Sequence, residues 1–379
     1  MYDLKVYSSY IVTAIKDKVV FFSAESGAVL HEIIIEQKAP AKDSNNDKQS
    51  KAPPANVVTF EYCSTAKVLV VSLSDKTLQC YQLCDNEPGR LKSKPLGENA
   101  FSTPRTIVCM KFAPKHGVLF GTDKSDCFEL DVLGRSEQTS KWILGHMSQI
   151  LALAISEDER FIITGDRDEK IKVSSYPDCY NIECFCLGHF EYVAGIEVIS
   201  SDKLISASGD RTLRLWDFTV GKEMCKLTLK EPALALTTQK VADSDTVLCA
   251  MRSYAQNKVE VAIVSYDKPE ASLVYDNLTI AEGLTILSVA FSAPLQLMLL
   301  TMEKESKRVS LLVYDFCVEQ KHFMAHSGHP LTKNFEHQFN GVTIELERDY
   351  STLFKHTCDN LTEYFERKKI KMETKKKSK

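Results

Sequence analysis

Three histidines close together in the last quarter of the chain have a spacing that could support metal chemistry. His322, His326 and His329 are separated by four and three positions, which can place imidazole ligands on one side of a helix or loop. No fourth ligand occurs at a recognisable spacing, and Gly328 and Pro330 interrupt the segment. We therefore favour a solvated loop over a metal site.

Other catalytic motifs are missing from the sequence. His31-Glu32 would begin the zinc motif H-E-x-x-H, but that motif needs a histidine where the chain has Ile35. There is no G-x-G-x-x-G segment, no phosphate-binding P-loop and no G-x-S-x-G nucleophile turn. The sequence therefore predicts a binding subunit without catalytic residues or a cofactor of its own.

Two further histidines belong to a repeated pattern. Leu144-Gly145-His146 precedes FIITGDRDEKIKVSS, and Leu187-Gly188-His189 precedes LISASGDRTLRLWD. His146 and His189 are 43 residues apart, and Asp168 and Asp210 in the following turns are 42 apart. Each copy has a β-rich run, a polar turn and an alternating strand, which predicts a hairpin. This period, with Gly-His near the start and Trp-Asp at the end, is typical of a blade of a WD-repeat β-propeller.

The resemblance to WD repeats also implies a structural hydrogen-bond network. In such repeats a turn aspartate accepts from the histidine, which contacts a hydroxyl on the neighbouring strand, and that hydroxyl meets the tryptophan. The second copy has the residues for this network: His189, Ser206, Asp210 and Trp216. The first copy has His146, Thr164 and Asp168, with Ser174 at the tryptophan position. We expect these residues to be structural, and the first blade of the pair to be locally weaker.

The length of the chain fits a complete ring of blades. At about 42 residues per blade, seven blades need about 300 of the 379 residues. We therefore predict an all-β, seven-bladed propeller over residues 1–320, with the second and third blades at about 57–96 and 105–144. Beyond Thr228 the motif fades, and the last blades are inferred from alternating apolar runs. The N-terminal strand Leu4–Tyr7 is expected to pair with the last blade and close the ring.

Three segments depart from the repeat pattern. Residues 37–55 contain three prolines and almost no large apolar side chain, which predicts a disordered insertion in the first blade. Residues 321–349 are predicted to form a polar loop and a return strand, GVTIELE. Residues 350–379 are predicted to form a short helix and a basic, disordered tail.

The tail differs in charge from the rest of the chain. The whole chain has a net charge of −4, yet residues 367–379 carry eight basic residues against Glu373. These basic residues include Arg367, Lys368, Lys369, Lys371, Lys375, Lys376 and Lys377. Such a tail can contact RNA phosphates through counterion release, serve as a nuclear import signal, or simply be solvated.

Composition indicates a globular protein with free thiols. No apolar run reaches the roughly 18 residues that span a membrane, and the N-terminus lacks the succession of regions found in signal peptides. The twelve cysteines include no C-x-x-C pair. This pattern favours buried free thiols in a reducing compartment over disulfides or zinc.

Two motifs carry a more specific resemblance. The run RFIITGDRDEKIKV crowds five charged residues into the turn at 166–170, and ECFCLGHFEYV follows it. Both resemble motifs of the WD-repeat, non-catalytic subunit of the eukaryotic tRNA (guanine-N7) methyltransferase, the Wuho-like family. The segments Leu353–Lys355 and Asp359–Phe365 resemble the short helix that follows the propeller in that family.

The resemblance implies a heterodimer. A separate catalytic subunit would bind S-adenosylmethionine, while this chain would hold that subunit in a conformation competent to methylate tRNA. Read as an import signal, the basic tail leads us to expect a nuclear location, with the cytoplasm left open, and the lack of a long apolar run leads us to expect no membrane association. We expect the charged turn to bind the partner through Asp166, Arg167, Glu169, Lys170 and Lys172. Strand alternation places Lys172 opposite Ile171 and Val173, where we expect it to reach an acidic side chain of the partner.

A propeller adaptor for a ubiquitin ligase or a chromatin complex is the alternative. Ligase-docking propellers often end a blade in W-D-x-R. Here Trp216-Asp217-Phe218 is followed by Thr219, which counts against that alternative.

Overall fold

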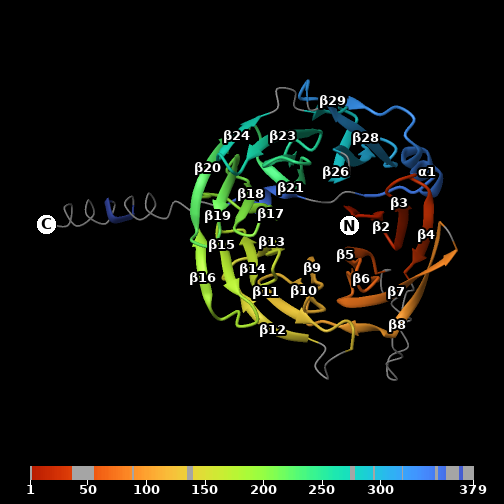
Figure 1. Ribbon diagram of the computed structural model, residues 1–379, viewed down its shortest axis with the longest axis horizontal. Coiled ribbons are helices and arrows are strands. Elements are labelled where there is room, and N and C mark those ends of the chain that lie inside the picture. The colour runs from red at the N-terminus through yellow and green to blue at the C-terminus, as the bar shows by residue number, and fades with distance from the viewer. Residues whose placement is uncertain are drawn as a thin grey trace, which may run out of the picture.

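The chain folds into a ring of seven antiparallel sheets around a central axis (Figure 1). The computed structural model describes residues 2–35, 55–87, 89–134, 140–273, 278–292, 295–317, 319–345, 349–355 and 367–369. In every sheet the strands follow one another in chain order, from the innermost strand to the rim. The expected seven-bladed propeller is confirmed. Most of the predicted insertion at 37–55 lies outside the described residues.

The blades are numbered in chain order. Blade 1 contains β1 (Tyr2–Val6), β2 (Tyr10–Ile15), β3 (Lys18–Ser23) and β4 (Val29–Ile34), and blade 2 contains β5 (Val57–Cys63), β6 (Val68–Leu73), β7 (Thr77–Glu87) and β8 (Arg90–Ser102). Blade 3 contains β9 (Cys109–Ala113), β10 (Val118–Thr122), β11 (Asp126–Leu130) and β12 (Ser140–Gly145). Blade 4 contains β13 (Ile150–Ile155), β14 (Phe161–Asp166), β15 (Ile171–Ser175) and β16 (Ile182–Cys186).

The remaining blades complete the ring. Blade 5 contains β17 (Val193–Val198), β18 (Lys203–Ser208), β19 (Thr212–Asp217) and β20 (Lys222–Thr228). Blade 6 contains β21 (Ala233–Lys240), β22 (Thr246–Ser253), β23 (Lys258–Ser265) and β24 (Glu270–Leu273), with β25 (Leu278–Thr279) also paired to β23. Blade 7 contains β26 (Leu284–Ser292), β27 (Gln296–Glu303), β28 (Val309–Cys317) and β29 (His322–Ala325).

The core lies between the blades. The buried apolar residues fall into seven clusters, and each cluster joins two neighbouring sheets. In blade 2, for example, all six residues of β6 are buried, because both faces of the sheet are covered by neighbours. The outermost strand of blade 4, β16, is mostly exposed. Interior strands therefore read as continuous apolar runs, while rim strands do not.

The ring closes differently from our expectation. The N-terminal strand β1 pairs with β2 of its own blade, and blade 7 is completed by its own β29. The prediction that Leu4–Tyr7 would join the last blade is therefore wrong. The innermost strands β26 and β1 contact each other, and the seam between blades 7 and 1 is filled by side chains. Apolar packing at this seam therefore joins blades 7 and 1 without a strand shared between them.

A helix completes this seam. The helix α1 (Pro330–Gln338) lies within the segment that we predicted to be a polar loop, and buries Leu331 and Phe335 against blades 7 and 1. His329 caps it by accepting a hydrogen bond from Leu331 N, and Pro330 begins it, a position where proline is favoured. Gly27 has φ +67°, and a Cβ there would lie 2.5 Å from Leu331 N, so glycine is required for the helix to dock.

The C-terminal segment also departs from the prediction. In the described part of the expected return strand, residues 341–345, the pairing is one bridge between Arg308 and Thr343. Beyond residues 346–348, which lie outside the described residues, η1 (Tyr350–Leu353) lies against blade 6, where Arg252 of β22 donates a hydrogen bond to Tyr350. We call residues 349–355 the strap. The predicted helix beyond it lies mostly outside the described residues. Within the described part of the chain, no helix is both long and apolar enough to cross a membrane.

Candidate partner-binding surface

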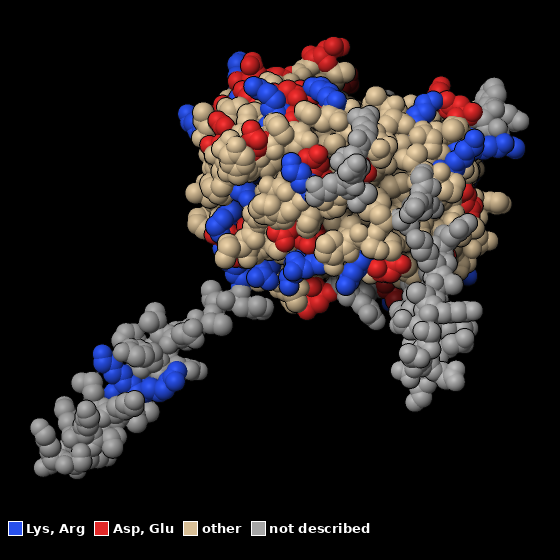
Figure 2. Space-filling view, turned by 90° about the horizontal axis from the view of Figure 1, so that it is seen from below, with Lys and Arg blue, Asp and Glu red and all other residues tan. Residues whose placement is uncertain are grey.

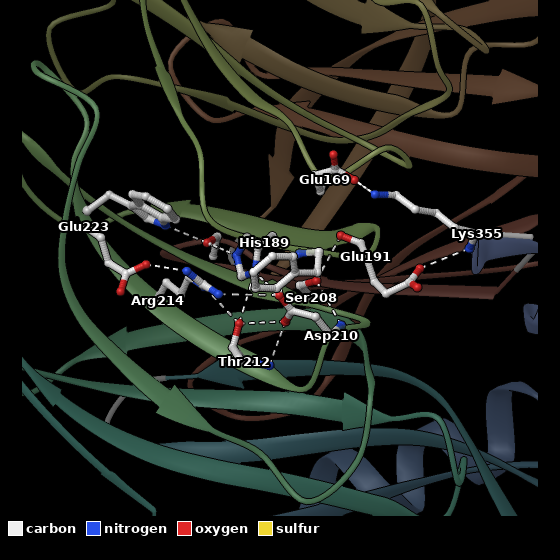
Figure 3. Close-up of polar contacts among 12 residues, drawn as sticks. Glu169, His189, Glu191, Ser208, Asp210, Thr212, Arg214, Glu223 and Lys355 are labelled. Atoms are coloured by element: carbon white, nitrogen blue, oxygen red, sulfur yellow. Dashed lines mark hydrogen bonds and ion pairs between the residues drawn. The ribbon is translucent and has the colours of Figure 1, made fainter. Parts of the chain in front are cut away.

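Blade 5 contains the complete hydrogen-bond network expected from its sequence (Figure 3). His189 Nδ1 lies 3.0 Å from Asp210 Oδ2, and His189 Nε2 lies 2.7 Å from Ser206 Oγ. Trp216 Nε1 donates to the same Ser206 oxygen at 2.8 Å. Thr212 Oγ1 donates to Asp210 Oδ1 at 2.6 Å. These bonds join the loop before β17 to β18, to β19 and to the turn between those two strands.

The network sets the ionisation of its buried groups. Burial of Asp210 opposes its charge, but hydrogen bonds from His189 and Thr212 prevail and lower its pKa to about 2. Burial lowers the pKa of His189, although Asp210 acts in the opposite direction. The arrangement suits a neutral histidine that donates to a carboxylate. These groups bond to one another within the sheet, which fits a structural role.

Blade 4 uses a different aspartate from the one predicted. His146 Nδ1 lies 2.9 Å from Asp166 Oδ2, and its Nε2 lies 2.7 Å from Thr164 Oγ1. Asp166 Oδ1 also accepts from Lys170 N at 2.8 Å. Asp168 follows Thr164 at the same distance along the chain as Asp210 follows Ser206. Its side chain is partly exposed, and its Oδ1 lies 3.6 Å from Arg167 Nε. Asp168 is therefore not the structural aspartate, and Asp166 belongs to this network rather than to the exposed surface.

The tryptophan position of blade 4 is occupied by a small polar residue. Ser174 is fully buried, and its hydroxyl has no hydrogen-bond partner within the described part of the chain. Thr164 consequently lacks the indole donor that Ser206 receives from Trp216 in blade 5. An unpaired buried hydroxyl costs about 1–3 kcal/mol. The weaker local network expected for this blade has this physical basis.

The turn after β14 presents cations to solvent. Arg167 and Lys170 are exposed, whereas Lys172 on β15 is only 7% exposed. Lys172 Nζ donates to Gly145 O at 2.6 Å, and burial lowers the pKa of the Lys172 amine. The expectation that Lys172 is free to reach an acidic side chain of a partner is therefore wrong. Alternation does turn it away from Ile171 and Val173, but blade 3 covers that face.

Exposed apolar side chains occur on the rim strand of blade 4 and in the two loops that connect blade 4 to its neighbours, a feature that our sequence analysis missed. Met147 is fully exposed in the loop between blades 3 and 4, and Phe190 is 73% exposed in the loop between blades 4 and 5. Leu187 is exposed beside Phe190, and Ile182 and Phe185 are exposed on the rim strand β16. We call Met147, Arg167, Lys170, Leu187 and Phe190 the blade 4 patch. A sequence signal existed: large apolar residues directly follow each Gly-His pair, where a loop would otherwise be polar.

The strap contacts the same region (Figure 3). Lys355 forms an ion pair with Glu169 of the charged turn, and its backbone N–H donates to Glu191 Oε2 at 3.1 Å. Phe354 packs edge-on against Tyr192 and Tyr254, with ring centroids 5.2 and 5.5 Å away. Glu169 is thus engaged within the chain. Arg167 and Lys170 remain as the exposed cations of the turn.

Comparison with known proteins identifies the family. The non-catalytic subunit wuho of the tRNA (guanine-N(7)-)-methyltransferase from Anopheles gambiae is 70% identical over 382 residues, covering 99% of this chain and 100% of that protein. This chain belongs to that family. Its Aedes aegypti member is 32% identical over 394 residues, covering 97% of this chain and 96% of its own. A family model described as the tRNA methyltransferase TRM82 WD40 domain matches residues 134–320.

A solved structure supports the fold alone. A chain in the crystal structure of the mitotic checkpoint complex superposes with a TM-score of 0.61 at 15% identity, covering 79% of this chain and 85% of that one. As a member of the Wuho-like family, the chain is a non-catalytic subunit, as its sequence predicted. Membership favours this role over the alternative of a ligase or chromatin adaptor.

Charge is mixed over the surface of this Wuho-like chain. Figure 2 shows lysine and arginine interspersed with aspartate and glutamate on the displayed face, without one broad basic area. Arg367, Lys368 and Lys369 are helical and exposed. Lys371, Lys375, Lys376 and Lys377 lie outside the described residues. The role of the tail therefore stays a prediction.

The histidine group and the cysteines have structural surroundings. His326 Nδ1 lies 2.6 Å from Asp315 Oδ2, His329 caps α1, and His322 lies in β29. Within the described residues, no group of three or more His, Cys, Asp or Glu could hold a metal ion. The described cysteines are all free.

Proposed function

We propose that this chain docks a separate catalytic subunit of tRNA (guanine-N7) methyltransferase through the blade 4 patch. The partner subunit would bind S-adenosylmethionine, and the propeller would hold it in a conformation competent to form 7-methylguanosine in the variable loop of tRNA. The observation that carries this proposal is the exposure of Met147, Leu187 and Phe190 in the two loops that flank blade 4, whose charged turn carries two exposed cations. Exposed apolar groups next to charges are typical of interfaces between proteins.

The patch suits a partner of mixed apolar and acidic surface. Phe190 is an aromatic side chain that can enter a partner pocket, and such anchors carry much of the energy of an interface. Arg167 and Lys170 would pair with carboxylates at the edge, which mainly affects association rate and specificity. Lys172 contributes indirectly, because its bond to Gly145 O supports the loop that carries Met147.

Co-purification of the two subunits tests this proposal. Phe190→Ser and the double variant Arg167→Glu, Lys170→Glu are expected to abolish capture of the co-expressed catalytic subunit and tRNA methylation. The melting temperature of the free chain should change by no more than a few degrees, because these side chains are exposed. Lys76→Glu is the matched control, since Lys76 is an exposed cation in the corresponding turn of blade 2. A fully active complex formed by both patch variants would place the docking surface elsewhere.

The basic tail is proposed to contact tRNA phosphates within the assembled complex. Replacing Lys375, Lys376 and Lys377 with alanine is expected to weaken tRNA binding and flatten its dependence on salt concentration, without affecting subunit association. Binding measured between low and physiological salt provides the slope. An unchanged slope would leave nuclear import as the role of the tail, which the cellular location of a tail-deleted chain would then test.

A further inference from the structure

A cavity lies beneath the strap at the centre of the ring. Its volume is about 470 Å³, within the range of small-molecule sites. Its wall is mostly apolar and comes from the inner strands and adjoining loops, through Val58, Val108, Ile150, Leu151, Ala194 and Leu234. Asp349, Tyr350 and Leu353 of the strap form its cover. The cavity shares no lining residue with the blade 4 patch, so the proposed docking does not use it.

A buried arginine without an acidic partner lines the cavity. Arg252, at the end of β22, is 6% exposed. Its Nη1 donates to Ile286 O and Tyr350 Oη, both at 3.2 Å, and its guanidinium lies 5.3 Å from the centroid of the Tyr350 ring. Its Nε has no hydrogen-bond partner, and among the described residues no carboxylate forms an ion pair with it. A buried guanidinium is costly without a counter-charge.

A second unpartnered donor lines the same cavity. Tyr192 is fully buried, and its hydroxyl has no hydrogen-bond partner among the residues that the structure describes. Burial raises the pKa of the Tyr192 phenol, so it stays protonated at neutral pH and can donate. Buried polar groups are nearly always hydrogen-bonded, and two unpaired donors on one cavity are therefore unusual. Together they supply one positive charge and one neutral donor.

We propose that the cavity under the strap binds a small organic monocarboxylate. The carboxylate would accept hydrogen bonds from Arg252 and Tyr192, and the apolar part of the ligand would contact Val58, Val108 and Leu234. A carboxylate matches the fork of a guanidinium and carries the single negative charge needed to neutralise it. A phosphate monoester fits less well, because its second charge would stay unpaired.

Hexanoate is a suitable probe, with hexanol as the neutral ligand of equal length. Titration of the full chain is expected to show saturable hexanoate binding, with hexanol at least about tenfold weaker, because only the carboxylate neutralises Arg252. The Nε–H resonance of Arg252, followed by nitrogen-labelled NMR, should shift with hexanoate and stay in place with hexanol. This measurement uses the unmodified chain, so it does not depend on the folding of a variant.

Two substitutions separate the charge from the apolar wall. Arg252→Met should reduce hexanoate affinity at least about tenfold and leave hexanol affinity unchanged, and Tyr192→Phe should reduce hexanoate affinity less. Arg211→Met, at an exposed arginine outside the cavity, is the matched control and should bind as the wild type does. Equal binding of hexanoate and hexanol, or an unmoved Arg252 resonance at saturation, would overturn the proposal. Tighter binding of hexyl phosphate than of hexanoate would overturn the choice of a carboxylate.

Discussion

Blades 4 and 5 share a histidine, a hydroxyl and an aspartate, yet they place the aspartate differently. In blade 5 the aspartate is Asp210 in the turn, and the network extends to Trp216. In blade 4 it is Asp166 at the end of β14, and the network stops at Thr164. Moving the aspartate back by two residues anchors the base of the turn and leaves Arg167 and Lys170 facing solvent. A blade can thus relinquish part of its internal network and gain an exposed, charged turn.

The largest expected effect comes from making blade 5 resemble blade 4. Trp216→Ser removes a fully buried indole that packs against blade 4 and donates to Ser206. The loss should reduce the free energy of unfolding by about 3–5 kcal/mol, as for other large-to-small substitutions in cores. Chemical denaturation of the free chain measures it. A loss below about 1 kcal/mol would show that the indole is dispensable, as it is in blade 4.

Two aspartates of one turn provide the next test. Asp166→Ala leaves His146 and Lys170 N without their acceptor and should cost about 2–3 kcal/mol of stability. Asp168→Ala removes a partly exposed carboxylate and should change stability by less than about 0.5 kcal/mol. The comparison uses the same denaturation measurement. Equal effects of the two substitutions would restore Asp168 to the network and contradict the difference between the blades.

Acid should weaken both networks, because hydrogen bonds lower the pKa of each aspartate. The pKa of Asp210 falls from 3.8 to about 2 on folding, so its stabilisation is present above pH 3.8 and is lost as the pH falls toward 2. The ionised Asp210 stabilises the folded chain by about 2 kcal/mol above this pH range. Stability measured between pH 5 and pH 2 should therefore fall less steeply in Asp210→Asn than in the wild type. Parallel curves for the two proteins would argue against a lowered pKa.

A smaller effect, of opposite sign, is expected at the unpaired hydroxyl of blade 4. Ser174→Ala removes a buried oxygen without a partner and should raise stability by about 1 kcal/mol. Ser206→Ala in blade 5 is the matched substitution, and it should lower stability because it breaks two hydrogen bonds. A loss of stability in Ser174→Ala would mean that this hydroxyl has an acceptor or donor in the folded chain.

The fold could be predicted from the sequence wherever the spacing of residues along the chain determines their relative positions. The repeat placed His189, Ser206, Asp210 and Trp216 correctly, because the strand–turn–strand register fixes their relation. The same rule failed for Asp168, since two carboxylates in one turn compete for the histidine and only geometry selects Asp166. Counting blades succeeded because each sheet is a local unit. Ring closure depends on side-chain contacts between the first and the last blade, which a local sequence pattern does not contain.

The candidate surface was harder to predict. Alternation showed which face of β15 carries Lys172 but not that blade 3 covers that face. In a propeller both faces of an interior strand are buried, so a lysine there needs a carbonyl partner and is not free for docking. The apolar residues of the blade 4 patch were missed because an isolated Met or Phe in a sequence predicts burial. Their exposure emerges only when the loops around one turn are brought together.

Closure by a helix has a consequence for synthesis of the chain. The seam between blades 7 and 1 is completed by α1, which follows the last strand of the propeller. Chains fold from the N-terminus as they leave the ribosome, so all seven sheets are made before the helix that joins the two ends. Until then, apolar side chains such as Phe22 on blade 1 lack their helical cover. A chain arrested just before Pro330 would keep these apolar side chains exposed, and chaperones bind such exposed apolar surface.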